Sequence, residues 1–259
     1  MAKKSMRPRK PRGKTKNKSK KWRYIGIGVA SLLMLLLAAG LWRVSRHLIH
    51  PKVEVARAEY PIQGIDVSSL NGSIDFTRVA ANGICFVYAK ASEGTQFRDP
   101  KFSYNITAAH KAGLTVGAYH FFRKDKPGKE QARNFIEAVK NVQLDMPLVI
   151  DVEDWGNSRF SNHDEVICNL SDMIKALQAD DYRLMIYTNK DGYRKYMHEH
   201  FPHLPLWLCA FTHPKKLKES YTYVIQQFSH WGSVDGIEGE VDLNIFCGDS
   251  TAWQRWLHE

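Results

Sequence analysis

The segment Pro147-Leu-Val-Ile-Asp-Val-Glu-Asp154 is the most informative one for the fold of this chain. Its first half is wholly apolar, which is typical of a strand buried on both faces of a parallel sheet. Side chains alternate along a strand, so Asp151 and Glu153 project to one side and Val152 to the other. The segment therefore predicts a buried strand that carries two carboxyl groups at its C-terminal end.

From residue 64 onward, short apolar runs alternate with helical patterns. Such alternation is typical of parallel strands covered by helices on the outside. Eight strands in about 190 residues is the number that closes a barrel filled by its own side chains. The sequence therefore predicts an α/β fold, a TIM-like barrel in a single catalytic domain, whose last three strands have mostly lost their helices. The expected strands are 64–69, 84–91, 114–122, 147–154, 183–188, 205–211, 223–229 and 241–246, and the expected helices are 74–81 with Ser73 as N-cap, 100–112, 127–142, 162–180 and 190–199.

Charge is unevenly distributed along the chain. The whole sequence holds 37 Lys and Arg against 27 Asp and Glu, a net charge of +10. Residues 1–50 contain 14 of the basic side chains and no acidic one, so residues 51–259 are slightly acidic. The basic character therefore belongs to the N-terminus and does not indicate a nucleic-acid-binding domain. We expect no nucleic-acid partner.

The N-terminal part of the sequence resembles a membrane anchor. Residues 1–23 are rich in Lys and Arg, which predicts a disordered cytoplasmic tail. Residues 24–42 carry no charge, and as a helix they would be about 28 Å long, close to the roughly 30 Å hydrocarbon core of a bilayer. We expect a transmembrane signal anchor at 24–42, a stalk at 43–62 and a catalytic barrel at 63–259. The basic tail would stay cytoplasmic and direct the barrel to the periplasmic or cell-wall side.

Two other interpretations of the apolar segment stay open. Ala38 and Gly40 are small enough for the processing site of a cleaved signal peptide, which would give a secreted protein. A core helix could be equally apolar, although the basic tail beside it has no core to join.

The carboxyl groups carry the chemical prediction. Two further acids lie on the expected first and last strands, at Asp66 and Asp242, which are neighbours in a closed barrel. Crowded, poorly solvated carboxyl groups keep a proton on one member. A protonated acid beside an ionised one is what glycoside hydrolysis requires. We therefore predict a glycosidase-type site at this end of the barrel, formed by Asp66, Asp151, Glu153 and Asp242.

Aromatic residues at strand ends are candidates for stacking on sugar rings. These residues are Tyr88, Tyr119, Phe121, Tyr187 and Trp207. The alternative is that the strand-end acids cap backbone N–H groups and that the aromatic side chains belong to the core.

Eight motifs together resemble the glycoside hydrolase family 25 lysozymes, the N-acetylmuramidases sometimes called Chalaropsis-type. They occur in family order and cover residues 64–247, almost the whole domain after the stalk. The motifs are Gly64-Ile-Asp-Val-Ser68, Ile74-Asp-Phe76, Lys90-Ala-Ser-Glu-Gly94, Gly117-Ala-Tyr-His-Phe121, Asp151-Val-Glu153, Ile186-Tyr-Thr188, Pro205-Leu-Trp207 and Val241-Asp-Leu-Asn244.

The resemblance implies a (β/α)5β3 barrel that hydrolyses the β-1,4 bond between N-acetylmuramic acid and N-acetylglucosamine. It implies that Glu153 is the general acid/base and that Asp151 orients the 2-acetamido group of the substrate, which attacks the anomeric carbon. Asp66 and Asp242 would complete the acidic floor.

Two substrate contacts are also implied by the resemblance, at Glu93 and Gln227. In the family pattern a Trp precedes the residue that corresponds to Gln227. This chain has Gln226 there, which puts one sugar-stacking contact in doubt.

Two rival functions remain at this stage. A metal-dependent polysaccharide hydrolase or deacetylase would use ligands such as His120 or the cluster at 198–203. A membrane-tethered glycan-binding module would keep the cleft without turnover. We expect a peptidoglycan glycan strand as substrate, the lipid bilayer as a partner through residues 24–42, a monomer, and no cofactor or metal. The pairing of the four cysteines, Cys85, Cys168, Cys209 and Cys247, does not follow from their spacing.

Overall fold

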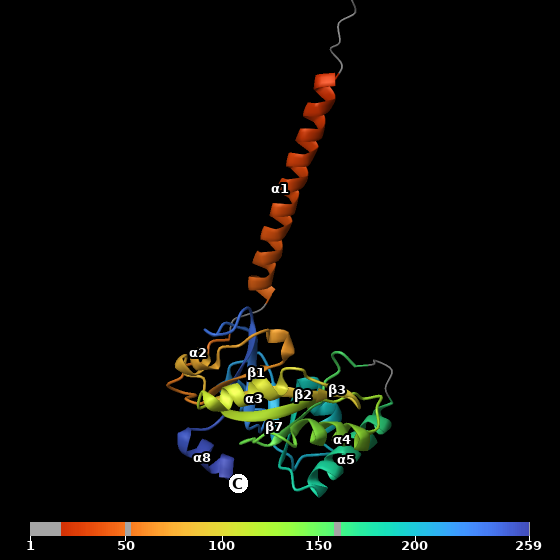
Figure 1. The fold of residues 1–259 in the computed structure, drawn as a ribbon, viewed down its shortest axis with the longest axis vertical. Helices are drawn as coiled ribbons and strands as arrows, with labels where there is room; N and C mark the ends of the chain where they lie inside the picture. The colour runs from red at the N-terminus through yellow and green to blue at the C-terminus, as the bar shows by residue number, and fades with distance from the viewer. Residues whose placement is uncertain (1–16, 50–52, 158–161, 259) are drawn as a thin grey trace, which may run out of the picture. The chain divides into compact units, whose positions relative to one another are not determined.

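The computed structural model describes residues 17–49, 53–157 and 162–258. The chain divides into two compact units, Met1–Pro51 and Lys52–Glu259 (Figure 1). The predicted tail at 1–23 lies largely outside the described residues.

The first unit contains one long helix, α1 (Asn17–Ile49). It extends beyond the predicted span at 24–42 into the predicted stalk, because 43–49 contains neither Gly nor Pro and each added residue gains a backbone hydrogen bond. Within the described residues, no helix meets the length and apolarity needed to cross a bilayer. The predicted transmembrane anchor and bilayer contact are therefore not supported.

The second unit is a closed eight-stranded barrel. Strand β1 pairs in parallel with β2 and antiparallel with β9, which closes the sheet, and among the eight barrel strands all other neighbours pair in parallel except β8 with β9. A two-residue strand, β3 (Phe97–Arg98), adds to the end of β2. The predicted α/β barrel is confirmed. The barrel strands are β1 (Gln63–Val67), β2 (Phe86–Glu93), β4 (Thr115–Phe121), β5 (Leu148–Asp151), β6 (Leu184–Asn189), β7 (Leu206–Cys209), β8 (Ile225–Gly232) and β9 (Val241–Phe246).

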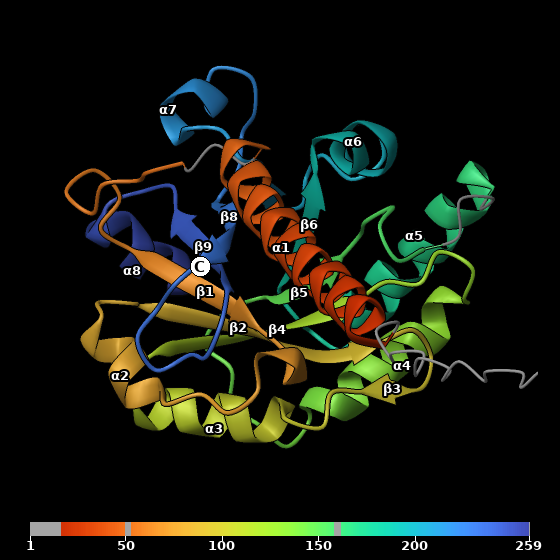
Figure 2. The same ribbon diagram turned by 90° about the horizontal axis from the view of Figure 1, so that it is seen from above.

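Helices α2 to α5 lie on the outside of the sheet, as Figure 2 shows, and increase in length in that order. After β6 the connections contain only short helical segments, and β8 passes to β9 without a helix, as the sequence predicts. The helical segments of this unit are η1 (Ser69–Asn71), α2 (Phe76–Ala81), α3 (Phe102–Lys111), α4 (Gly128–Val139), α5 (His163–Ala179), α6 (Lys190–Gly192), the π-helix η2 (Tyr193–Met197), α7 (Pro214–Leu217) and α8 (Ser250–His258).

Local capping explains where two of these helices begin. Asp75, not the predicted Ser73, is the N-cap of α2, and its Oδ1 accepts hydrogen bonds from Thr77 N at 3.1 Å and Arg78 N at 3.2 Å. A carboxylate suits this position because it also faces the positive end of the helix dipole. Asn162 caps α5 in the same way, as expected for that boundary.

Two layers of apolar side chains form the core. One lies between the sheet and the surrounding helices, and the other fills the barrel interior with Phe86, Tyr88, Val149 and Trp207 among its members. Helix α8, which the sequence analysis missed, packs Trp253 on the ring of Phe86 at 5.4 Å between centroids. Phe86 lies at the start of β2, so α8 covers the N-terminal end of the barrel and the C-terminal end carries the cavity described next.

Candidate active site

A cavity of about 920 Å³ opens at the C-terminal ends of the barrel strands. Its wall contains carboxyl groups, aromatic rings and cations from most of the strands or the loops that follow them. The lining residues that matter for the chemistry are Asp66, Lys90, Tyr119, Phe121, Asp151, Glu153, Trp155, Tyr187, Lys190, Arg194, Trp207, Cys209, Phe211, Gln227, His230 and Asp242.

The structure brings together all four acids that the sequence singled out. Asp66 lies on β1 directly opposite Asp242 on β9 in the strand register. Asp151 is the last residue of β5, and Glu153 lies two residues beyond it, so both carboxyl groups point into the cavity. Strand alternation therefore placed these side chains correctly, and barrel closure brings the two ends of the domain together.

Asp66 is held by two amide donors at the bottom of the cavity. Its Oδ2 accepts hydrogen bonds from Gln227 Nε2 at 2.9 Å and from Asn244 Nδ2 at 2.8 Å. The two amides are themselves oriented, because Tyr187 OH donates to Gln227 Oε1 at 2.7 Å and Trp207 Nε1 donates to Asn244 Oδ1 at 2.9 Å. Burial, reinforced by the charge of the neighbouring acid on β9, raises the pKa of Asp66 well above its ordinary value, although both amide donors oppose this.

Asp151 has a carboxyl oxygen that accepts no hydrogen bond from the described residues. Its side chain is 7% exposed, and its Oδ1 has no hydrogen-bond partner among the described residues. Burial, and then the charge of Glu153, raise the pKa of Asp151 well above its ordinary value, while Lys90 opposes the shift. A buried, unsatisfied carboxyl oxygen is costly, so its presence at the wall of a cavity points to a ligand that completes it.

Glu153 is a buried acid with a raised pKa. Burial is the largest cause, the charge of Asp242 adds to it, and the positive charge of His230 opposes it. The charge of Glu153 in turn raises the pKa of Asp151, so ionisation of one of these acids disfavours ionisation of the other. Both acids therefore keep a proton to higher pH than ordinary carboxyl groups do.

The loop that carries Glu153 is fixed from several sides. Asn157 Nδ2 donates to the carbonyl oxygens of Glu153 and Phe122, each at 3.0 Å. Asp154 accepts hydrogen bonds from Lys124 Nζ at 2.8 Å and from Tyr196 OH at 2.7 Å, and it also pairs with Lys195.

These donors to Asp154 include an almost buried cation. Lys124 is only 5% exposed, so it depends on this carboxylate for its charge to be compensated. Burial opposes ionisation of Asp154, but the surrounding lysines and the tyrosine lower its pKa well below its ordinary value. The residue next to the proton-holding Glu153 is therefore a permanent anion that anchors the loop.

Four of the five predicted aromatic residues line the cavity, and one does not. Tyr119, Phe121, Tyr187 and Trp207 form part of the wall. Tyr88 is fully buried, and its hydroxyl donates to the Pro147 carbonyl at 3.1 Å, near the start of β5. Its ring is turned toward the N-terminal half of the barrel interior, so the prediction that Tyr88 stacks on a sugar is wrong.

Space for the Tyr88 ring comes from a glycine on the next strand. A Cβ on Gly117 would lie 2.3 Å from the ring, which no real contact allows. The side chain therefore belongs to the interior packing, where it lies 4.8 Å from Trp207 between ring centroids.

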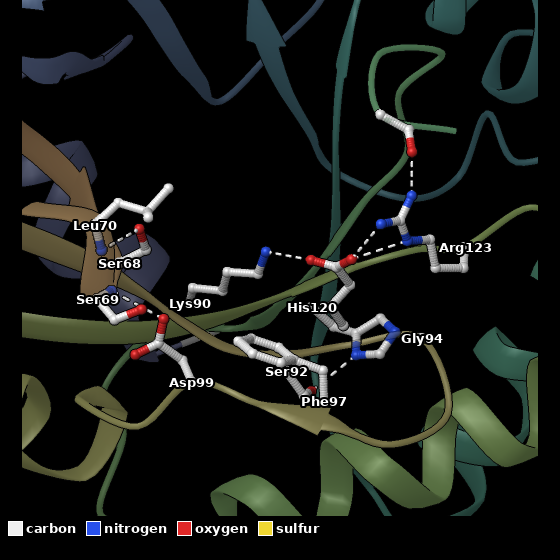
Figure 3. A network of polar contacts seen from close by, with 12 residues as sticks. Ser68, Ser69, Leu70, Lys90, Ser92, Gly94, Phe97, Asp99, His120 and Arg123 are labelled. Atoms are coloured by element: carbon white, nitrogen blue, oxygen red, sulfur yellow. Dashed lines mark hydrogen bonds and ion pairs between the residues drawn. The ribbon is translucent and has the colours of Figure 1, made fainter. Parts of the chain in front are cut away.

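Glu93 also differs from its predicted role, because it is absent from the cavity wall. Its carboxylate binds Lys90 Nζ at 2.5 Å and Arg123 Nε at 2.9 Å, and Figure 3 shows the charged ends of Lys90 and Arg123 facing one another. Burial opposes ionisation, but the two cations lower the pKa of Glu93. Lys90 does line the cavity, with Nζ 5.1 Å from the centroid of the Phe121 ring. Glu93 thus orients a cation of the wall rather than reaching into the cavity.

His120, a ligand in the rival metal hypothesis, is buried on the other side of β4 from Tyr119. Its Nδ1 lies 2.8 Å from Ser92 Oγ (Figure 3) and its Nε2 lies 3.2 Å from Gln131 Oε1. Burial lowers the pKa of His120 to about 4. Among the described residues, no group of three or more His, Cys, Asp or Glu side chains is arranged to hold a metal ion.

Sequence reasoning missed several members of the wall. His230 binds Asp242 at 2.7 Å and lies 3.9 Å from the sulfur of Cys209. Trp155, which is 79% exposed, and Phe211 add aromatic surface. Strand alternation alone would have placed His230 on the opposite face from Gln227, three residues away, and a bulge in β8 is what turns both toward the cavity. All four cysteines are free thiols.

Comparison with known proteins adds three findings to this geometry. The sequence pattern of Glycosyl hydrolases family 25 matches residues 65–237. YegX from Escherichia coli strain K12, a protein described as uncharacterized, is 34% identical over 206 residues, covering 77% of this chain and 75% of YegX. The autolytic lysozyme of Clostridium acetobutylicum is 33% identical over 186 residues, which cover 71% of this chain and 56% of that enzyme.

A solved structure agrees with the sequence relatives. The family 25 glycosyl hydrolase from Bacillus anthracis superposes with a TM-score of 0.72 at 31% identity, covering 80% of this chain and 98% of that chain.

Proposed function

This chain belongs to glycosyl hydrolase family 25, and we propose that it hydrolyses the β-1,4 bond between N-acetylmuramic acid and N-acetylglucosamine in peptidoglycan. The observation that carries the proposal is the pair of buried acids with raised pKa values, Asp151 and Glu153, at the wall of a cavity large enough for several sugar rings. Two relatives described as lysozymes, from Clostridium acetobutylicum and Streptomyces globisporus, support the choice of bond. The catalytic domain in this proposal is residues 63–259.

In the first step Glu153 acts as the general acid. Its proton passes to the glycosidic oxygen as the bond to the anomeric carbon breaks, and the carbonyl oxygen of the 2-acetamido group bonds to that carbon. The raised pKa of Glu153 supports this role, because a general acid must still hold its proton near the working pH. In the second step the Glu153 carboxylate takes a proton from water, and the resulting nucleophile opens the cyclic intermediate at the anomeric carbon.

Asp151 has the complementary role in the proposal. Its open Oδ1 can accept the acetamido N–H, which holds the group in line and stabilises the positive charge that forms on it. Asp66 and Asp242 maintain the negative field of the floor, and Gln227 holds Asp66 in place. Tyr119, Phe121, Tyr187 and Trp207 offer ring faces and edges to the sugars.

The cell wall is the place of action that this activity requires. Because peptidoglycan lies outside the cytoplasm, we propose that the barrel acts on the cell-wall side, as the relation to an autolytic lysozyme also suggests.

Mass spectrometry of muropeptides released by the purified protein tests the proposal. We expect new reducing ends on N-acetylmuramic acid, which sodium borohydride reduction converts to muramitol. Reducing ends on N-acetylglucosamine would identify a glucosaminidase instead, and binding without any released product would identify a glycan-binding module. Full activity after exhaustive chelation is expected as well.

A further inference from the structure

His230 is a cavity residue to which the proposed mechanism gives no role. It lies on β8, and its ring packs edge-on against the Phe211 ring at 4.7 Å between centroids and 74° between planes. Its Nε2 faces Cys209 Sγ on β7 at 3.9 Å, and its Nδ1 faces Asp242 Oδ1 on β9 at 2.7 Å. Contacts on both nitrogens and on the ring edge fix the imidazole in one orientation.

The contact with Asp242 makes His230 a stable cation. Partial burial disfavours the imidazolium, but the hydrogen bond and charge of Asp242, together with Cys209, raise the pKa of His230 to about 10. Burial also raises the pKa of Cys209, so its thiol stays protonated and does not cancel the imidazolium charge.

This cation differs from the other positive charges at the wall. Among the described residues that line the cavity, Lys90 binds Glu93, Arg194 pairs with Asp191, and Lys190 Nζ approaches Thr212 Oγ1 at 3.4 Å. His230 alone of these four is bonded to one of the four acids of the floor.

The position of His230 matters for Glu153. The positive charge of His230 lowers the pKa of Glu153, and the negative charge of Asp242 raises it. Asp242 also raises the pKa of Asp66. The ion pair therefore presents Glu153 with two opposite charges at a fixed separation, and loss of either charge would leave the other uncompensated.

We propose that His230 is a positioning residue of the hydrolytic site: its imidazolium, held by Asp242 at 2.7 Å, is the counter-charge that opposes the effect of the Asp242 carboxylate on Glu153. This inference rests on the proposed function of Glu153 as general acid. It assigns Asp242 to an ion pair rather than to direct proton transfer.

The pH dependence of kcat/KM tests the inference in two variants. The basic limb reports loss of the Glu153 proton in the free enzyme. In His230→Gln the cation is gone, Glu153 keeps its proton to higher pH, and the basic limb moves up by roughly half a pH unit or more. In His230→Lys the charge is restored, and the limb returns toward its wild-type position. Equal limbs in the wild type and His230→Gln, or equal displacement in both variants, would overturn the inference.

A matched control uses another histidine–aspartate contact of this chain. His110 Nε2 lies 3.6 Å from Asp145 Oδ1, away from the cavity lining. His110→Gln is expected to leave both the rate and the pH profile unchanged, which separates a general effect of losing a histidine from the effect at the site.

Nitrogen NMR of the imidazoles gives a readout that does not depend on activity. In the ¹⁵N-labelled full chain, the His230 signals, assigned by their absence from His230→Gln, should remain those of an imidazolium at pH 8. In Asp242→Asn they should titrate near the ordinary value of about 6.5. A neutral His230 at pH 8 in the wild type would refute the inference. Inactive wild-type protein, or an active Glu153→Gln variant, would instead refute the proposed function.

Discussion

Two adjacent residues, Val152 and Glu153, show how strand alternation separates structure from chemistry. The valine side chain is fully buried in the layer between the sheet and the helices, while the glutamate faces the cavity. The backbone of Val152 is held as well, since its N donates to Tyr187 O at 2.9 Å and its carbonyl accepts from Thr188 Oγ1 at 2.6 Å. Substitutions at the two positions should therefore have different consequences.

Val152→Ala is expected to reduce stability with little effect on chemistry. Removing two buried methyl groups and leaving a cavity should lower the free energy of unfolding by about 1–3 kcal/mol. Urea denaturation measures this loss, and kcat per folded molecule should stay within about threefold of the wild type. A drop in kcat of a hundredfold with unchanged stability would show that this side chain belongs to the site.

Single residues of the site differ in how far the sequence could indicate their roles. The four acids could be predicted, because each follows from strand alternation and from the closure of a barrel. The role of Asp154 could not, because its donors Lys124 and Lys195 are about 30 and 40 residues away and meet it only in the folded barrel. Tyr88 was misassigned because its burial depends on the missing side chain of Gly117 on the neighbouring strand.

At the scale of elements, the contact of α4 with α5 depends on a glycine. Gly128 opens α4 against the backbone of α5, and a Cβ at this position would lie 1.7 Å from the carbonyl oxygen of Asn169. A backbone atom cannot rotate away as a flexible side chain can, so a larger residue must push the helices apart. The sequence does not reveal this close approach of the two helices, because Pro127 and Gly128 resemble an ordinary helix start.

Gly128→Ala is predicted to destabilise the barrel by about 1–3 kcal/mol, because overpacking a close contact displaces both helices. The midpoint of chemical denaturation measures it. Lys129→Ala, an exposed change one residue further along the same helix, should alter stability by less than about 0.5 kcal/mol. Equal stability of Gly128→Ala and the wild type would mean that the two helices do not approach this closely.

Most strands and helices of the barrel could be predicted from the sequence, but their exact boundaries, helix α8 and the π-helix η2 could not. Strands with continuous apolar runs, such as β5, have a clear pattern. Helix α8 was missed because its Trp253 and Trp256 face the barrel end in a segment with few apolar neighbours in sequence. The π-helix η2 replaced the end of a predicted α-helix at 190–199, since hydrogen-bond spacing inside a helix leaves no mark in the apolar pattern.

For the barrel as a whole, burying the acids of the site lowers the free energy of unfolding once they ionise. Asp66, Asp151 and Glu153 all have pKa values raised by burial, so the folded state binds their protons more tightly than the unfolded chain does. The stabilising effect of such groups is complete at low pH and is lost as the pH rises through their raised values. The barrel therefore holds these acids at a cost in stability that grows as the pH rises, as expected where a fold maintains a reactive site.

Asp151→Asn should relieve part of this cost in a pH-dependent way. The variant carries no charge at this position at any pH. Its free energy of unfolding, minus that of the wild type, should therefore be larger at pH 8 than at pH 4. Urea denaturation at the two pH values measures the difference. Glu219→Gln, an exposed acid, should differ from the wild type by less than about 0.5 kcal/mol at both. A relative stability of Asp151→Asn that does not change with pH would show that Asp151 is not a buried, charge-strained carboxyl group.

The turnover of Glu153→Gln on purified peptidoglycan tests the central claim most directly. The glutamine keeps the size and burial of the side chain but has no proton to give to the glycosidic oxygen, so kcat should fall by about 10²–10⁴ while the fold is preserved. Release of muropeptides with reducing-end muramic acid, followed over time for equal amounts of folded protein, measures the effect. A Glu153→Gln protein that releases these products at nearly the wild-type rate would contradict the account.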